Sequence, residues 1–416
     1  PARRPRAPRR ARPARQRARR APALGRERAP HARGLPPRAR RRTRGGAVTH
    51  PVGLVHDWLT GQRGGEHVLR EIARRFPGAP IYTLFHFPGS VDPEIEAHPI
   101  VTSFVQRAPG LDPGYRWYLP LFPFAIEDLP VDGHRLLVST SHCVAKSARR
   151  APGAFHLCYC HTPMRYAWDQ EEAYFGTGRG PLALLRRSVL AGLRRWDVAT
   201  AGRVDLYVAN SRFVAARIQR YYGRRAVVVP PPVDTVHFHP DPARPRGHVL
   251  MVAALAPYKK VDRAIHACEA AGLPLVVVGE GPERARLERL AGPRTRLAGR
   301  VDAGTLRDLY RGAICFLQPG IEDFGIAAVE ALACGTPVVA RGEGGVLDIV
   351  RDGREGVFFG SDEPDAIRDA IDKCRGMQFN SMNLRERAES FSAGRFAQRL
   401  EETLVSGWPD AGGILA

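Results

Sequence analysis

Two glutamates on either side of a glycine are the residues of this chain best suited to chemistry. Glu322 and Glu330 lie eight positions apart, and Gly325 lies between them. An apolar, strand-like run (313–317) precedes the pair, and a helix-like run (327–334) contains the second glutamate. In α/β proteins, a loop that joins a strand to a helix N-terminus binds phosphate-bearing ligands, because unpaired backbone N–H groups face the anion there.

The residue types in this segment suit a ligand that carries both phosphate and hydroxyl groups. Gly325 allows backbone N–H groups to approach an anion closely. We expect Glu322 to stand in the loop at the ligand and Glu330 to lie in the first turns of the helix. A carboxylate accepts hydrogen bonds from a diol, each contributing about 1.5–3 kcal/mol. The alternative interpretation is the solvated start of an ordinary helix.

A lysine lies at another expected strand-to-helix turn. Lys259 follows a strand-like run (249–255) and precedes a helix-like run. An ammonium group at such a turn can meet a diphosphate as a point charge. Lys260 is a further candidate for the same contact. The alternative is that both are solvated lysines at the start of a helix.

A histidine closes a strand-like run in the first half of the chain. His161 follows 155–160 and belongs to a dense polar and aromatic cluster (159–169). Its imidazole could hydrogen-bond a ligand or steady charge at a reacting atom. Arg165 and Asp169 are secondary candidates in the same cluster. A single histidine at a strand end is otherwise a structural residue.

Two glycine-containing turns complete the candidate set. Gly64 and Gly65 follow the first strand-like run and precede a helix-like run, so they can present N–H groups to an anion. Their spacing differs from G-x-G-x-x-G, which disfavours a nicotinamide cofactor. Gly299 and Arg300 end another strand-like run. Ordinary turns explain the glycines at that second position equally well.

Regular alternation of strands and helices in the second half must position these residues. Such alternation is typical of a parallel sheet with helices on both faces. The expected strands cover 249–255, 273–279, 296–301, 314–317, 337–340 and 356–359. The expected helices cover 261–271, 282–291, 304–312, 326–334 and 345–352.

The first half follows the same order less regularly. A proline-rich stretch near 230–242 separates the two halves and reads as a linker. We therefore expect an α/β protein with two Rossmann-like domains and a ligand cleft between them. The expected boundaries are a tail (1–46), a first domain (47–230), a linker (231–246), a second domain (247–390) and a C-terminal helical segment (391–416).

The net charge of +21 points to nucleic acid only at first sight. Residues 1–46 contain 18 arginines and one glutamate, which leaves 45 basic and 41 acidic residues elsewhere. This Arg/Pro-rich tail lacks apolar periodicity, so we expect it to be disordered. The favoured interpretation is a translated upstream stretch with the true start near residue 47. A tether to nucleic acid or an anionic membrane, and a transit-like segment, are the alternatives.

The sequence predicts no membrane-spanning helix, because no uninterrupted apolar run reaches the 18 residues that such a helix needs. The seven cysteines are expected to pack as buried small hydrophobes in a reducing compartment. A metal at Cys158 and Cys160 is the alternative, but no second Cys/His pair has zinc-finger spacing. A basic amphipathic helix (182–196) fits either an anionic membrane surface or an ordinary domain helix.

The Glu322–Glu330 segment resembles the E-x7-E signature of the family-4 retaining glycosyltransferases, which have the two-domain GT-B fold. In that fold the last helix often crosses back to the N-terminal domain, so the resemblance implies the same for the segment 391–416. The resemblance implies that Glu322 faces the donor sugar and Glu330 binds the nucleotide ribose. It also implies that the loop amides at Phe324, Gly325 and Ile326 hold the donor. Lys259 would meet the diphosphate, with Lys260 beside it. The arginine that usually precedes this lysine in the family is replaced here by Ala254.

The first half carries further similarity to the same family. His161 looks like the family's donor-facing histidine, and Gly64-Gly65 resembles its N-terminal glycine loop. Gly299 and Arg300 match elements beside the nucleotide base. The 159–169 pattern is similar to bacterial mannosyltransferases that build cell-surface polysaccharides, which makes GDP-mannose the first choice of donor.

The resemblance implies hexosyl transfer from a nucleotide-sugar to a glycan or lipid-linked acceptor, with no cofactor and no metal ligands. No Asp-x-Asp occurs in the sequence, which disfavours a metal-dependent GT-A transferase. We expect a cytoplasmic enzyme with peripheral contact to an anionic membrane. A GT-B sugar-nucleotide epimerase or phosphorylase is one alternative. A nucleic-acid-binding protein that acts through the tail is the other, disfavoured by the near-neutral remainder.

Overall fold

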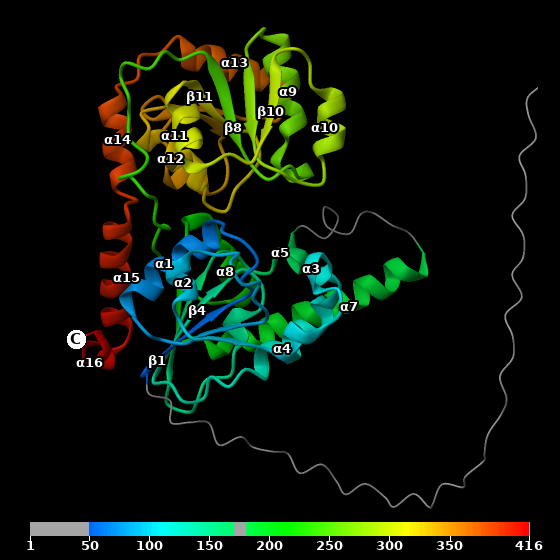
Figure 1. Cartoon of the computed structure of the whole chain (residues 1–416), viewed down its shortest axis with the longest axis vertical. Helices are drawn as coiled ribbons and strands as arrows, with labels where there is room; N and C mark the ends of the chain where they lie inside the picture. Colours follow the sequence, from blue (N-terminus) through cyan, green and yellow to red (C-terminus); the bar gives the residue numbers. More distant parts are fainter. Residues whose placement is uncertain (1–49, 170–179, 416) are drawn as a thin grey trace, which may run out of the picture. The chain divides into compact units, whose positions relative to one another are not determined.

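The second half of the chain forms a six-stranded parallel sheet. In the computed structural model, which describes residues 50–169 and 180–415, the strand order is β10-β9-β8-β11-β12-β13 (Figure 1). The strands are β8 (His248–Val252), β9 (Leu275–Val278), β10 (Thr295–Gly299), β11 (Ala313–Gln318), β12 (Val338–Arg341) and β13 (Gly356–Phe359). The order reverses between β8 and β11, which makes their carboxyl ends the default ligand-binding edge.

Helices connect successive strands of this sheet, as parallel pairing requires. They are α9 (Val261–Ala270), α10 (Arg284–Leu290), α11 (Ala303–Arg311) and α12 (Ile326–Ala333), whereas α13 (Pro364–Arg375) follows the last strand, β13. A further helix, α14 (Ser381–Glu389), packs on α12. Alternate strand residues enter two different hydrophobic clusters, so both faces of the sheet are covered.

The first half forms a seven-stranded parallel sheet with the order β3-β2-β1-β4-β5-β6-β7. The strands are β1 (Val52–His56), β2 (Ile81–Thr83), β3 (Ile100–Thr102), β4 (Leu136–Ser141), β5 (Phe155–Cys160), β6 (Leu206–Ala209) and β7 (Ala226–Val228). The order reverses between β1 and β4, so this sheet also has a switch point.

Two groups of helices cover the faces of the first sheet. Leu54 and Leu136 contribute to one cluster with α1 (Gly64–Arg75), whereas the adjacent Val55 and Leu137 contribute to another. This alternation follows the two-residue period of a strand. The second cluster includes α4 (Phe122–Glu127) and α7 (Pro181–Thr200). The remaining long helix of this half is α8 (Arg212–Tyr222).

The C-terminal helix α15 (Ala393–Gly407) packs on the first sheet, although it follows the second in the chain. Its Phe396, Leu400 and Leu404 belong to the same cluster as residues of α1, β4 and β5. Figure 1 shows α15, in red, beside this half of the molecule. The helix therefore completes the hydrophobic core of a sheet whose last strand ends at Val228, 165 residues before the helix begins at Ala393.

The expected pair of parallel α/β sheets is confirmed, and one expected helix is wrong. The segment 345–352 forms only a short 3-10 helix, η6 (Gly345–Asp348). Gly344 has a φ of +87°, and a Cβ at Gly345 would lie 2.3 Å from the Asp323 carbonyl oxygen. Contact with the neighbouring loop therefore determines this backbone in place of helical periodicity. The edge strand β3 and the helices α13 and α14 were not anticipated.

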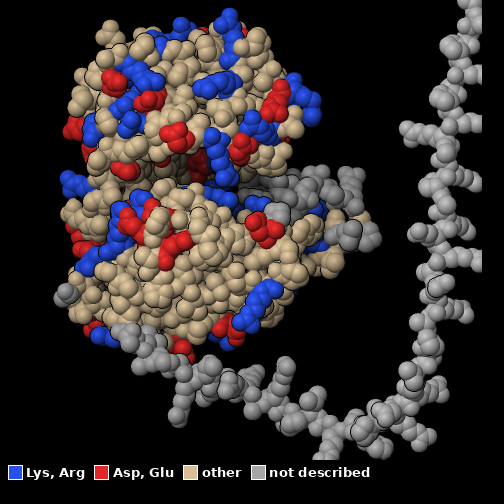
Figure 2. All heavy atoms as spheres, viewed as in Figure 1, with Lys and Arg blue, Asp and Glu red and all other residues tan. Residues whose placement is uncertain are grey.

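Other expectations have mixed outcomes. All seven cysteines are free and buried, and Cys158 and Cys160 share one cluster. In the described ranges, 50–169 and 180–415, no helix is long and apolar enough to cross a bilayer. The tail expected at 1–46 lies outside the described residues. On the face seen in Figure 2, acidic and basic side chains are interspersed, as the near-balanced charge of the remainder predicts.

Truncating the C-terminal helix's apolar face should destabilise the first sheet. Leu404→Ala removes a side chain that is 3% exposed and should lower the free energy of unfolding by about 2–4 kcal/mol. Val405→Ala, on the exposed side of the same helix, should change it by no more than about 0.5 kcal/mol. Urea denaturation measures the free energy of unfolding of both variants. If Leu404→Ala changed this free energy as little as Val405→Ala does, α15 would not contribute to the core.

Candidate active site

The loop 320–325, here called the glutamate loop, joins β11 to α12 at the switch point of the second sheet. Neighbouring backbone holds it closely on two sides. A Cβ at Gly320 would lie 2.6 Å from the Tyr258 carbonyl oxygen, and the Gly345 N–H donates to the Glu322 carbonyl at 2.8 Å. Gly325, at the start of α12, has a φ of +106°, a conformation that favours glycine.

Lys259 and Glu322 form an ion pair in this loop. Both side chains are largely buried, and the Lys259 ammonium also lies 5.0 Å from the centre of the Tyr258 ring. Lys260 points elsewhere, since its ammonium lies 3.2 Å from the Asp362 carboxylate. Its φ of +58° turns the backbone between Lys259 and helix α9. The structure thus brings Lys259, and not Lys260, to the predicted glutamate.

His161 lies at the end of β5, next to the glycines that begin α1. A Cβ added to Gly65 would be 3.6 Å from His161 Nε2 and 3.7 Å from His56 Cε1. His161 Nε2 is buried and has no hydrogen-bond partner among the described residues. Burial, reinforced by the nearby His142 and His56, lowers the pKa of His161 to about 3. The imidazole is therefore neutral at physiological pH and can exchange hydrogen bonds with a ligand without carrying charge.

The glycines of α1 also contact the second sheet domain. A Cβ at Gly64 would lie 2.8 Å from Ile326 Cδ1, at the N-terminus of α12. The predicted residues therefore lie close together in space: His161 lies beside Gly65, and the adjacent Gly64 lies beside Ile326. From there the chain itself leads through the glutamate loop to Glu322 and Lys259. The two anion-binding turns expected from the sequence face each other.

Glu330 lies on α12, partly buried, and accepts a hydrogen bond from the Tyr310 hydroxyl at 2.8 Å. Burial raises the pKa of its carboxyl from 4.5 to about 7, an effect that the Tyr310 hydrogen bond and His237 partly oppose. A carboxylate that has lost water is a good acceptor for ligand hydroxyls, because such hydrogen bonds recover the lost solvation.

The remaining predicted residues lie in less accessible or more exposed places. The Phe324 side chain is 3% exposed and its ring centre lies 5.7 Å from that of Phe391, so only its backbone can meet a ligand. Gly299 ends β10 with a φ of +70°, and its carbonyl accepts from the Gly279 N–H at 2.8 Å. Arg300 follows on the exposed surface.

Several residues that shape the site were missed by sequence reasoning. The fully buried Asp57 accepts four backbone N–H groups, from residues 142–145, at 2.6–3.0 Å. It thereby fixes His142 next to His56 and His161. Asp57 follows β1 directly, and an acidic residue at a strand end was the available signal. Asp323 and Arg217 were also missed, whereas the secondary candidates Arg165 and Asp169 both lie in ion pairs with them.

Comparison with known proteins agrees with this geometry. The sequence profile "Glycosyl transferases group 1" matches residues 236–391, and "Glycosyltransferase Family 4" matches residues 62–237. The chain belongs to the family-4, group 1 glycosyltransferases. The family expected from the E-x7-E segment is confirmed. The two profiles divide the chain between its two sheets.

Two relatives illustrate the range of similar proteins. A GDP-mannose-dependent alpha-(1-6)-phosphatidylinositol dimannoside mannosyltransferase of Mycobacterium tuberculosis is 35% identical over 228 residues, which are 50% of this chain and 59% of that one. A D-inositol 3-phosphate glycosyltransferase of Acidothermus cellulolyticus is 31% identical over 304 residues, 61% of this chain and 66% of that one. The matches thus span less than two thirds of either relative.

Solved structures show the fold. The Anabaena protein HepE, crystallised with UDP and glucose, superposes with a TM-score of 0.64 at 18% identity, covering 86% of this chain and 100% of its own. Sucrose-phosphate synthase from Thermosynechococcus elongatus superposes with a TM-score of 0.63, also at 18% identity, covering 86% and 98%. The chain therefore has the GT-B fold, as expected.

The raised pKa of Glu330 predicts a pH-dependent stability. Because the fold favours the protonated carboxyl, its contribution to stability is present below about pH 4.5 and is lost as the pH rises to about 7. Glu330→Gln should therefore be more stable than wild type at pH 8 by between about 1 and 3 kcal/mol, and by less at pH 5. Thermal unfolding from pH 5 to 8 measures the difference.

Glu386→Gln provides the matched control for this measurement, because Glu386 lies exposed on α14. It should follow the wild-type stability profile across the whole pH range. A Glu330→Gln profile parallel to wild type would contradict the assigned environment of the Glu330 carboxyl.

Proposed function

We propose that the protein transfers a hexose from a nucleoside diphosphate sugar to an acceptor hydroxyl with retention of anomeric configuration. The observation that carries the proposal is the Lys259–Glu322 pair in a glycine-bounded loop at the switch point of the second sheet. The first choice of donor is GDP-mannose, which the name of the M. tuberculosis relative supports. The HepE structure, with UDP and glucose, supports the nucleotide-sugar class more generally.

The chain's own groups suit this reaction. The Lys259 ammonium and the backbone N–H groups at the start of α12 would stabilise the leaving diphosphate. Lys259 is paired with Glu322. A bound diphosphate would offer the ammonium a second anionic partner and would release Glu322 to accept hydrogen bonds from the sugar. Glu330 would bind the ribose hydroxyls, so no cofactor is required in the proposal.

The first domain would supply the other side of the reaction. His161 is neutral and has an unpartnered Nε2 beside Gly65, which suits a hydrogen bond to a sugar hydroxyl. A glycan or lipid-linked alcohol is the proposed acceptor. A GT-B epimerase or phosphorylase would use the same donor-binding groups but would release an epimerised sugar-nucleotide or a sugar phosphate. Product analysis distinguishes these reactions.

Donor binding can be tested with the full-length chain by thermal shift against GDP, UDP, ADP and their sugar conjugates. A ligand at about 100 times its dissociation constant should stabilise the fold by about 2.7 kcal/mol. A response to GDP supports the proposal, and a response to another nucleotide corrects the base. No response to any of them would contradict nucleotide-sugar transfer and would direct attention to nucleic acid binding by the tail.

Site variants test the assigned groups. Lys259→Ala and Glu322→Gln should each lower kcat for sugar transfer at least about 100-fold, because a preorganised charged group at the reacting atoms is lost. Lys373→Ala, on an exposed part of α13, serves as the control and should keep wild-type kcat. Wild-type turnover in both site variants would refute the assignment.

We also propose a cytoplasmic enzyme that contacts an anionic membrane through α4, α7 and the 3-10 helix η2 (Tyr115–Leu121). These elements share one hydrophobic cluster but expose large apolar side chains outward. Trp117 is 88% exposed, and Phe124 and Leu184 are 69% and 64% exposed. Residues 181–196 of α7 contain four arginines and no acidic residue. Exposed aromatic groups beside basic side chains suit the interface of anionic lipids.

Vesicle flotation tests this surface. The full-length chain should bind phosphatidylglycerol vesicles more tightly than phosphatidylcholine vesicles, and the double variant Trp117→Ser/Phe124→Ser should bind at least about fivefold less. Leu347→Ser, an exposed apolar residue of η6, is the control. Unchanged binding in the double variant would assign lipid affinity to the basic tail and refute this surface.

A further inference from the structure

We propose that Asp323 is a positioning residue, held by Arg165 and Arg217 of the first domain so that the glutamate loop is fixed for transfer only while both domains engage it. The inference rests on the proposed function, because it concerns how Glu322 and Lys259 are placed. Asp323 is the residue next to Glu322, yet the two carboxylates face different partners. The Glu322 carboxylate pairs with Lys259 of the second domain. The Asp323 carboxylate pairs with the two arginines of the first domain.

Three hydrogen bonds link the Asp323 carboxylate to the first domain. Oδ2 accepts from Arg165 Nε at 2.8 Å and from Arg165 Nη2, and Oδ1 accepts from Arg217 Nη1 at 2.6 Å. The Asp323 and Arg217 side chains are each 11% exposed. Although burial lowers it, the paired carboxylate of Asp323 and the nearby carboxylate of Glu322 keep the pKa of Arg165 above its ordinary value. The contact is thus charged, bidentate on Arg165, and mostly shielded from water.

The backbone of the same residue is also held from the first domain. Ser211 Oγ donates to the Asp323 carbonyl at 2.5 Å, and it accepts from the Val214 N–H as the N-cap of α8. The adjacent Asn210 Nδ2 donates to the His161 carbonyl at 2.9 Å. The end of β6 therefore holds both the predicted histidine and the glutamate loop, which sets their relative position.

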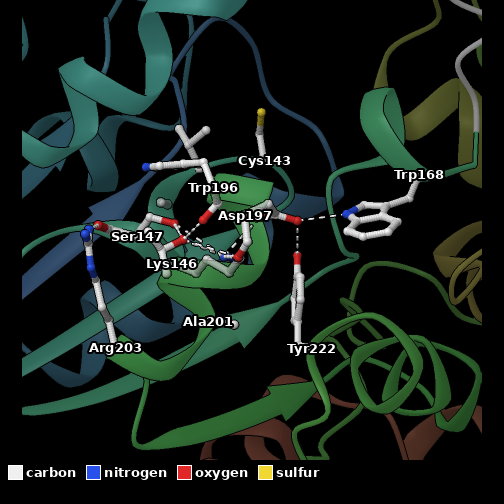
Figure 3. A network of polar contacts seen from close by, with 12 residues as sticks. Cys143, Lys146, Ser147, Trp168, Trp196, Asp197, Ala201, Arg203 and Tyr222 are labelled. Carbon is white, nitrogen blue, oxygen red and sulfur yellow. Dashed lines mark hydrogen bonds and ion pairs between the residues drawn. The ribbon is translucent and has the colours of Figure 1, made fainter. Parts of the chain in front are cut away.

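The helix that carries Arg165 is fixed by a buried network around Asp197, which Figure 3 shows. Arg165 begins the short helix α5 (Arg165–Trp168), whose Trp168 Nε1 donates to Asp197 Oδ2 at 2.8 Å. Asp197 is fully buried, accepts from the Tyr222 hydroxyl at 2.9 Å, and pairs with Lys146 Nζ at 3.0 Å. The helix that presents Arg165 therefore has a rigid attachment inside the first domain.

Arg217 is fixed in a similar way. Its Nη1 also donates to Thr162 Oγ1 at 2.8 Å, and its guanidinium pairs with Asp169 at the end of α5. Two guanidinium groups thus face two carboxylates, of Asp323 and Asp169. Such a balanced cluster tolerates burial, whereas removing one member leaves an uncompensated charge. A loop held by this cluster keeps the angular precision that a reacting centre needs, since small misplacements can lower a rate about 100-fold.

The experiment separates positioning from donor binding. In Asp323→Asn and Arg165→Lys, kcat for transfer should fall about 100-fold, whereas the Kd of the nucleoside diphosphate should stay within about threefold of wild type. Arg165→Lys keeps the charge and loses the bidentate geometry, so it provides an answer where Asp323→Asn folds poorly. Arg212→Ala is the control, because it removes another ion pair between the domains, to Asp348, without touching Asp323. It should keep wild-type kcat.

A double-mutant cycle completes the test. The combination of Arg165→Ala with Asp323→Ala should lose no more activity than Asp323→Ala alone, because each variant already removes the Arg165–Asp323 ion pair. Wild-type kcat in Asp323→Asn and Arg165→Lys would overturn the inference while leaving sugar transfer intact. An equal loss of kcat and nucleotide affinity, with a lowered Tm, would also overturn it in favour of a purely structural contact. A wild-type chain that binds no nucleotide would overturn both the inference and the proposed function.

Discussion

The Asp323 carboxylate joins the two sheets of this glycosyltransferase by charge at the glutamate loop. Each sheet positions its own ligand-facing groups at the carboxyl ends of its strands, and neither sheet alone determines how the two sets meet. Two arginines from α5 and α8 bind one carboxylate of the loop between β11 and α12. The position of His161 relative to Glu322 therefore depends on this cluster of ion pairs, together with the Ser211 hydrogen bond to the Asp323 carbonyl.

That cluster is supported by a second buried pair, and the support follows from the cost of burying charge. An ammonium and a carboxylate removed from water are stable only if hydrogen bonds replace their lost solvation. Lys146 donates to the Asp197 carbonyl at 2.7 Å and to Thr200 Oγ1 at 3.2 Å, while Asp197 accepts from Trp168 and Tyr222. The polar groups therefore hold α5 in one orientation, which apolar packing alone would not specify.

The sequence allowed much of the fold and part of the site to be predicted. Strands such as β11 and β13 were anticipated because apolar runs end at clear turn residues, and Glu322 was recognised by its place between strand and helix. Asp323 was not recognised, because an acidic residue in a loop is usually interpreted as solvent-exposed. Its two arginine partners lie 158 and 106 positions away in the sequence. The expected helix at 345–352 failed for a related reason: contact with a distant loop determines that backbone.

The chain passes between the two sheets twice, after β7 and again before α15. These two crossings lie side by side, since Val233 and Ser392 form a parallel bridge and the Val233 N–H donates to the Phe391 carbonyl at 2.9 Å. Because the two crossing segments are bridged to each other, they form one connection between the sheets in place of two independent ones. A single proteolytic cut in either crossing would leave the other intact, with α15 still packed on the first sheet.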